Sequence, residues 1–264
     1  MRFAMVPFAS IVSMAVAAVV GIATPILLGW WLVKKYQMRT TPIMVGAGVF
    51  VVFALVLEPI VHQIVLKGPS GATIQGNIWY YALYGGLMAA LFEESGRFLA
   101  MKYVLKKEPD GFLTGVSYGI GHGGTEMLML FGLSMVSNLV VSALINSGQA
   151  DTILASVPAE AKAQAEAQFA QLESLSAGTL LLGLWERISA LILQIGLSLM
   201  VWTAVRRGGK WLWLLAAAFM LHFAVDAVAV VLSKSVSTWA VEIIIFAMAL
   251  AVGTIGLNLY RCRS

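Results

Sequence analysis

The sequence predicts an all-α membrane protein, a polytopic bundle of about seven transmembrane helices. Of its 264 residues, 60% are hydrophobic and 11% are charged, and the mean hydropathy is +0.88. Soluble domains contain roughly 25% charged residues. The apolar residues also form runs of about twenty or more, the length that crosses a bilayer as a helix. We therefore expect one transmembrane domain over residues 1–264, in a bacterial plasma membrane.

Seven apolar segments are long enough to be spans, and no gap between them would hold a soluble domain. They cover residues 5–33, 42–66, 78–101, 112–146, 178–205, 211–233 and 238–260. The first reaches Val33, which is too far for a signal-peptide core, so we expect a retained helix. The fourth is long enough to tilt strongly or to emerge from the bilayer.

The distribution of lysine and arginine predicts the orientation. Eleven of these residues follow the first, third, fifth and seventh spans, and four lie on the opposite side. The N-terminus is therefore expected outside and the C-terminus in the cytoplasm. The net charge of +4 does not indicate nucleic acid as a partner, because the basic residues lie in short loops. The single cysteine, Cys262, leaves no disulfide framework within the chain.

One external loop, residues 146–177, is long enough to fold. Its segment PAEAKAQAEAQFAQLESL is rich in alanine, glutamate and glutamine, which favour a helix. Pro158 suits the first turn of such a helix. Because the apolar residues of this segment are mostly alanine, we expect a solvated helical cap over the bundle.

The third span contains charges that a membrane helix normally lacks. The stretch LFEESGRFLAMKYVLKK includes Glu93, Glu94 and Arg97. A charged side chain at the centre of a membrane helix costs about 2.5–3.5 kcal/mol on insertion scales. Such residues face a bundle interior or a wet cavity and indicate a functional site. Arg97 follows the two glutamates by three and four positions, so it can hold a carboxylate ionised.

Two other spans carry histidine–acid pairs at a similar depth. His122 with Glu126, and His222 with Asp226, are i, i+4 pairs, so each pair lies on one helix face. At about 1.5 Å per residue, both histidines lie about 16 to 18 Å from the cytoplasmic ends of their spans, near the depth of Glu93. Three helices with polar groups at one depth predict a shared site. Structural locking of the helices is the alternative.

Five glycines surround His122 in the segment GVSYGIGHGGTEM. Glycine allows two helices to approach closely, or it leaves space for another backbone. The segment could therefore line a groove for an extended peptide, or it could serve close helix packing alone.

A second set of buried ionisable residues falls nearer the outside: Glu58, His62, Glu186 and Arg187. A buried glutamate–arginine pair can simply lock helices together. A lone histidine at a helix interface is usually a satisfied hydrogen-bonding residue. We interpret this second cluster as structural.

These motifs, in this order, resemble the YhfC family of intramembrane proteases. EESGR is similar to a paired-glutamate motif, HGGTE to a second motif and HFAVD to a closing HxxxD motif. LEPIVH and WERISALILQ, followed by AVRRGGKW, extend the resemblance over most of the chain. The wider group includes PrsW, the type II CAAX prenyl endopeptidases and, more distantly, the Aph subunit of gamma-secretase. Gln194 is a departure, because relatives are expected to have histidine near this position.

The resemblance implies hydrolysis of a peptide bond in a membrane-embedded or membrane-anchored substrate. It places the water-activating base on Glu93, with Glu94 and Arg97 orienting this base and balancing its charge. Glu126 takes the second-motif position, where CAAX proteases have histidine. The pair thought to stabilise the oxyanion corresponds here to the residues His222 and Asp226.

General chemistry allows two forms of this hydrolysis. In one, Glu93 is the general base, Glu126 holds the water or carries a proton, and His222 donates to the oxyanion. In the other, His122, Glu126 and His222 bind zinc and leave a fourth position for water. The sequence leaves open whether the cofactor is zinc or none. It contains no HExxH motif and no serine or cysteine in a nucleophile context.

Two other functions compete with proteolysis. A proton-coupled transporter also needs buried Glu, His and Asp residues, but transporters often contain internal repeats and the two halves of this chain show none. A non-catalytic scaffold similar to the Aph subunit would lack the glutamate pair, so Glu93 and Glu94 argue against that function.

Overall fold

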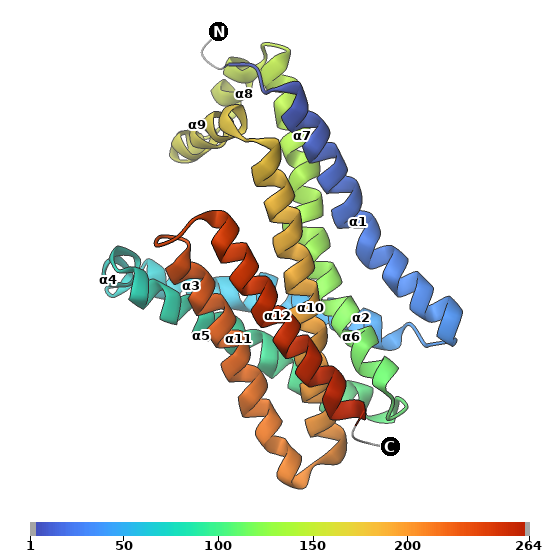
Figure 1. Cartoon of the computed structure of the whole chain (residues 1–264). Coiled ribbons are helices and arrows are strands. Elements are labelled where there is room, and N and C mark those ends of the chain that lie inside the picture. The colour runs from blue at the N-terminus through green and yellow to red at the C-terminus, as the bar shows by residue number, and fades with distance from the viewer. Residues whose placement is uncertain (1–3, 262–264) are drawn as a thin grey trace. The chain divides into compact units, whose positions relative to one another are not determined.

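The computed structural model describes residues 4–261, so the expectation for Cys262 falls outside the described part. All of their regular elements are helices joined by short connections, with no strand among them (Figure 1). The helices are α1 (Phe8–Tyr36), α2 (Thr41–Val49), α3 (Glu58–Leu66), α4 (Gly71–Gly76), α5 (Ile78–Leu99), α6 (Phe112–Glu126), α7 (Leu133–Asn146), α8 (Ala150–Ser156), α9 (Ala159–Ser174), α10 (Ala177–Arg207), α11 (Trp213–Leu232) and α12 (Thr238–Arg261). Three π-helical segments, Phe50–Leu57, Ala100–Val104 and Met127–Gly132, continue α2, α5 and α6.

Within the described residues, six helical stretches are long and apolar enough to cross a membrane. They are Phe8–Tyr36, Thr41–Leu66, Phe112–Asn146, Ala177–Arg207, Gly209–Leu232 and Thr238–Leu259, close to six of the seven predicted spans. The remaining predicted span, 78–101, forms α5 and is set apart by its charged residues. The all-α membrane fold is therefore confirmed, while the count of seven spans and the orientation stay predictions.

The chain divides into two compact units. The first contains Met1–Thr24 and Met127–Arg187, and the second contains Pro25–Glu126 and Ile188–Ser264. Helices α1 and α10 each contribute residues to both units. The assignment of the whole chain to one domain stays a prediction.

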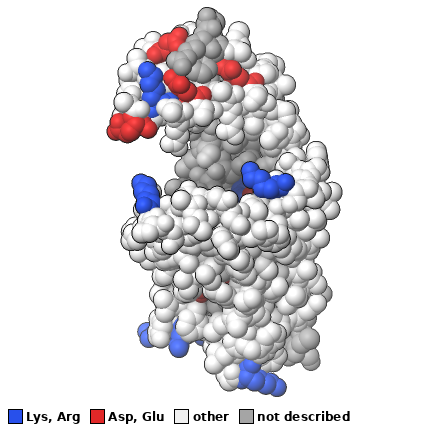
Figure 2. All heavy atoms as spheres, turned by 90° about the vertical axis from the view of Figure 1, so that its left-hand side faces the viewer, with Lys and Arg blue, Asp and Glu red and all other residues white. Residues whose placement is uncertain are grey.

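The first unit includes the loop for which a helical cap was predicted, and this loop forms α8 and α9. Pro158 directly precedes the first residue of α9. Phe169 and Leu172 of α9 are buried in a cluster with Phe131 and Met135, while most of the alanine-rich remainder is exposed. Figure 2 shows acidic side chains gathered over this helical pair. The loop is thus anchored by two large apolar residues on a mostly solvated helix.

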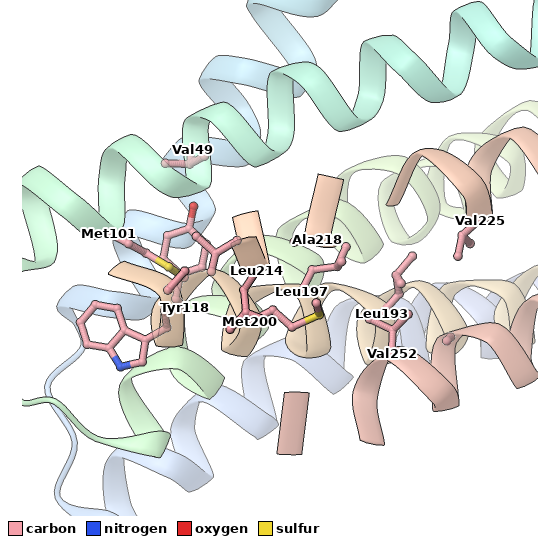
Figure 3. Packing of buried hydrophobic residues seen from close by; sticks show 14 of the residues in the cluster. Val49, Met101, Tyr118, Leu193, Leu197, Met200, Leu214, Ala218, Val225 and Val252 are labelled. Carbon is pink, nitrogen blue, oxygen red and sulfur yellow. The ribbon is translucent and has the colours of Figure 1, made fainter. Parts of the chain in front are cut away.

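The second unit has a core of long apolar side chains around α10. Leu197, Met200 and Trp202 of this helix are fully buried and pack with Met101 and Tyr118 (Figure 3). Lipid tails are as apolar as leucine, so such a core gains its stability in a membrane from van der Waals packing. Close fit between helices therefore matters more here than total apolar area.

Glycine creates the closest of these fits, between α2 and α6. A Cβ atom on Gly121 would lie 2.0 Å from the Ile43 carbonyl oxygen, and one on Gly46 would lie 2.3 Å from that of Tyr118. The other four glycines of the segment around His122 also have neighbouring side chains or backbone within contact distance. Of the two interpretations of this segment, the structure favours close helix packing over a peptide groove.

Candidate active site

The glutamate pair lies on α5, a helix with a defined start. The Asn77 side chain caps it by accepting the backbone N–H groups of Trp79 and Tyr80. Near the other end, Glu93 and Glu94 are only 7% and 6% exposed. Buried charges of this kind need partners, because the free energy of removing an unpaired ionised group from water is large.

Arg97 is the partner of Glu94. The fully buried guanidinium donates to Glu94 Oε1 at 2.5 Å and, through its second terminal nitrogen, to Gln194 Oε1. The same Glu94 oxygen interacts with His222 Nδ1 at 2.8 Å. Because an ionised carboxylate only accepts, Nδ1 is the protonated nitrogen in this pair. Arg97 and Glu94 together fix the position of His222.

Glu93 has a different set of partners, and all of them meet one oxygen. Its Oε2 lies 2.9 Å from His122 Nε2 and accepts the Gln194 side-chain N–H at 2.8 Å. The His122 ring is fully buried, with the edge of Phe50 against it and Tyr118 stacked on it. The sequence placed His122 in the shared site and suggested metal binding as its role, whereas in the structure its ring nitrogen contacts Glu93 and orients it.

Gln194 connects Glu93 and Glu126, a role that was not predicted from the sequence. Its Oε1 accepts from Arg97, and its Nε2 donates to Glu93 and, at 3.1 Å, to Glu126. These partners determine which way the amide points, since only oxygen can accept from a guanidinium. Space for the side chain comes from Gly123, where a Cβ would lie 2.8 Å from that of Gln194. A single amide within the apolar run LILQIGL is the sequence signal that could have identified it.

His222 and Asp226 complete the site from α11. His222 Nε2 lies 3.9 Å from Glu93 Oε2 and 3.5 Å from Asp226 Oδ2, longer than ordinary hydrogen bonds. The Asp226 side chain is 36% exposed, so the buried network reaches the surface at this residue. The structure thus brings together the five residues that were predicted to share one site: Glu93, His122, Glu126, His222 and Asp226.

The residues of the second predicted cluster belong to both units. Glu186 and Arg187 belong to the first unit and pair with each other. Glu58 and His62 belong to the second unit, where Glu58 Oε1 lies 3.1 Å from His62 Nε2. Glu58 is also close enough to Glu93, Asp226 and His222 for electrostatic interaction. The interpretation of Glu58 as part of a separate structural cluster is therefore corrected, because this carboxylate lies beside the site.

The π-helical segments border the site residues. One ends immediately before Glu58, one begins three residues after Arg97, and one begins immediately after Glu126. A π-helical turn contains an extra residue and changes the face on which later side chains lie, and such turns are frequent at functional sites. This irregularity is a feature of the backbone that apolar periodicity does not reveal.

The predicted zinc ligands do not fit a metal ion as the side chains lie. Over residues 4–261, no three His, Cys, Asp or Glu side chains are placed to share one ion. Of the predicted set, His122 Nε2 is directed at Glu93, and Glu126 Oε2 accepts from Gln194. His222 Nδ1 is bound to Glu94.

An apolar pocket lies on the two helices that carry Glu93 and His222. It has a volume of about 270 Å³ and is lined by Trp79, Ala82, Leu83, Ala227, Val228, Val231 and Leu232 of α5 and α11. Trp79 and Leu83 are 61% and 51% exposed, so the pocket opens sideways on the helix surface. Ala227 follows Asp226 in the chain, which places one wall of the pocket next to the exposed end of the polar network.

Comparison with known proteins agrees with the motifs. A family model described as "YhfC intramembrane metalloprotease" matches residues 20–245. The chain is 35% identical over 249 residues to "Uncharacterized membrane protein YhfC" of Bacillus subtilis strain 168, covering 93% of this chain and 94% of that protein. No solved structure matches.

Proposed function

The chain belongs to the YhfC intramembrane metalloprotease family, and on this premise we propose that it is an intramembrane endopeptidase that uses a glutamate-activated water. It is an integral membrane protein, so its substrate is a membrane-embedded or membrane-anchored polypeptide of a bacterial plasma membrane. The observation that carries this proposal is the position of Glu93, whose Oε2 is held by His122 and faced by His222.

Glu93 acts as the general base. Two hydrogen bonds to Oε2 fix the plane of its carboxylate, so that it removes a proton from the attacking water without first reorienting. The proton then passes to the nitrogen of the leaving amine as the peptide C–N bond breaks. Glu126 is joined to Glu93 by the Gln194 amide, and it is the second carboxylate that can hold this water or carry this proton.

His222 stabilises the oxyanion that forms on the peptide carbonyl. Its Nδ1–H is held by Glu94, which Arg97 holds in turn, so the ring orientation is fixed. The other nitrogen, Nε2, faces Glu93 and Asp226, and when protonated it donates to the negative oxygen. In the protease subtilisin, one preorganised donor of this kind stabilises the transition state by about 2.7–4 kcal/mol.

The apolar pocket supports a membrane substrate. Its lining is entirely of apolar residues, and it opens on the flank of two helices. An apolar side chain of a membrane segment can enter it from the lipid, while the polypeptide backbone extends toward Asp226. Burial of one large apolar side chain would contribute about 1.5–3 kcal/mol to substrate binding.

The name of the family favours a metal-dependent form of the same reaction. The steps proposed above run through the side chains of the chain itself. Metal analysis of the purified protein, combined with the effect of a zinc chelator on cleavage, distinguishes the two forms. If the protein contains stoichiometric zinc, and if chelation abolishes cleavage and added zinc restores it, the metal-dependent mechanism replaces the metal-free one.

Glu93→Gln tests the proposal. The amide is nearly isosteric but cannot take a proton from water, so cleavage should fall by roughly 10²–10⁴-fold. The measurement uses purified protein in lipid nanodiscs, a panel of transmembrane peptides and mass spectrometry of the fragments. Glu186→Gln, the same exchange in the first unit, is the matched control and should retain cleavage. Full cleavage by Glu93→Gln would remove this mechanism.

A further inference from the structure

Three residues beside the site form a hydrogen-bonded chain that the proposed mechanism does not use. Glu58 Oε1 lies 3.1 Å from His62 Nε2, and His62 Nδ1 lies 2.8 Å from the Tyr84 hydroxyl. Glu58 and His62 are on α3, and Tyr84 is on α5. Both ring nitrogens of His62 are therefore engaged, one by a carboxyl group and one by a phenol.

The chain has a buried end and an open end. The Glu58 side chain is 12% exposed, that of His62 is 31% exposed, and Tyr84 at the other end is partly exposed. At the buried end, the ionisable groups that face Glu58 come from three helices: His62 from its own helix, Tyr84 and Glu93 from α5, and His222 and Asp226 from α11. Glu58 thus lies between the proposed catalytic carboxylate and a partly exposed imidazole.

We propose that Glu58, His62 and Tyr84 form a proton relay that connects the Glu93, His222 and Asp226 group with the aqueous surface. A neutral imidazole between two groups that can each donate or accept is suited to this transfer, because it takes a proton on one nitrogen while releasing one from the other. Glu93 regains its carboxylate by protonating the leaving amine, and the relay carries away the proton that the new carboxylic acid of the product loses when it ionises beside the catalytic group.

The transfer has two states that differ by one proton. In the first, the Glu58 carboxyl donates to His62 Nε2, and Nδ1–H donates to the Tyr84 oxygen. In the second, Nε2–H donates to the Glu58 carboxylate, and the Tyr84 hydroxyl donates to Nδ1. Between them, the Glu58 proton bonds to Nε2, the Nδ1 proton moves to Tyr84, and the phenolic proton leaves to solvent water. The first state returns when Glu58 takes a proton from the Glu93, His222 and Asp226 group and the ring reverts to the Nδ1–H tautomer. No electrons are exchanged.

The relay predicts a change of His62 tautomer that can be observed without catalysis. The chain has three histidines, so protein labelled with ¹⁵N-histidine gives three imidazole ring systems, which single substitutions assign. We expect the neutral His62 ring to switch from the Nδ1–H to the Nε2–H tautomer as rising pH ionises Glu58. In Glu58→Gln the switch should be lost, and in the control Glu186→Gln it should remain. A single His62 tautomer at every pH in the native chain, or a switch that persists in Glu58→Gln, would overturn the relay.

The role of the relay in catalysis rests on the proposed peptidase function, and cleavage kinetics test this role separately from the tautomer measurement. His62→Ala should lower kcat by roughly 10²-fold, the lower end of acid–base contributions, with KM unchanged and with rescue by added imidazole. A structural role would lower the melting temperature without such rescue. Cleavage by the native chain together with full kcat in a folded His62→Ala contradicts the relay and leaves the peptidase proposal intact. If the native chain cleaves nothing, the peptidase proposal fails, while the tautomer measurement still decides the relay.

Discussion

At the scale of single residues, the site depends on a few buried groups with more than one partner each. Arg97 holds Glu94 and Gln194, and Gln194 holds Glu93 and Glu126. Each bond therefore fixes the next, and the carboxylates stay in place although they share a small volume. Removing one shared partner leaves several polar groups unsatisfied at once.

Gln194→Leu should unfold at a lower temperature and lose cleavage. Leucine has a similar size but cannot pair with Arg97, Glu93 or Glu126, and each buried group left unpaired costs about 1–3 kcal/mol. Thermal melts and peptide cleavage measure the two effects. Ser198→Ala is the control one turn away, because the Ser198 hydroxyl donates to the Gln194 backbone carbonyl of its own helix. Equal melts for Gln194→Leu and the native chain would show that the amide does not connect the network.

At the scale of elements, the catalytic candidates are positioned by helices that approach closely. The sequence predicted six of the long helices nearly to their ends. In lipid the backbone N–H and C=O groups must bond one another, and a long apolar segment achieves this as a helix. The sequence could not predict the π-helical segments or decide whether the glycines served a groove or packing. Both depend on which side chains of other helices lie opposite.

Gly121→Ala should destabilise the contact between α2 and α6. The new methyl group would lie 2.0 Å from the backbone oxygen of Ile43, which cannot move without its helix, and overpacking typically costs about 1–3 kcal/mol. Gly48→Ala is the matched control, since a Cβ at Gly48 meets nothing within 4 Å. The control should melt at or above the native temperature, because alanine favours a helix over glycine. An unchanged melt for Gly121→Ala would contradict the close packing.

Val228→Trp should raise KM and leave kcat largely unchanged. The indole would fill the apolar pocket between α5 and α11, so that a substrate side chain loses its binding site while Glu93 and His222 keep their partners. Peptide titrations measure KM and kcat separately. Met220→Trp, on an exposed face of the same helix, adds the same side chain outside the pocket and should leave KM unchanged. Identical KM values for both variants would exclude the pocket as a substrate site.

At the scale of the whole molecule, the distribution of charge predicts the orientation in the membrane. Basic residues concentrate on one side of the predicted spans, and this asymmetry predicts that the N-terminus and the 146–177 loop lie outside. The site would then lie within the bilayer, where a membrane segment of the substrate can reach it.

Cysteine labelling in intact cells tests this topology. Cys262 is first replaced by serine, and single cysteines are then introduced at the exposed positions Gln149 and Lys106. We expect an impermeant reagent to label Gln149→Cys directly and Lys106→Cys only after permeabilisation. The reverse pattern would invert the assignment.

The sequence alone determined what depends on residues close together in the chain. Span length, the positive-inside bias and the i, i+4 pairs of His122 with Glu126 and of His222 with Asp226 are local properties, and they were sufficient to identify a membrane helix bundle with a polar group at one depth. The tertiary structure decided the partners. His222 reaches Glu94 across 128 positions, and Gln194 reaches Arg97 across 97. Such contacts follow from how helices rotate and approach one another, which glycine and π-helical turns set and apolar periodicity does not encode.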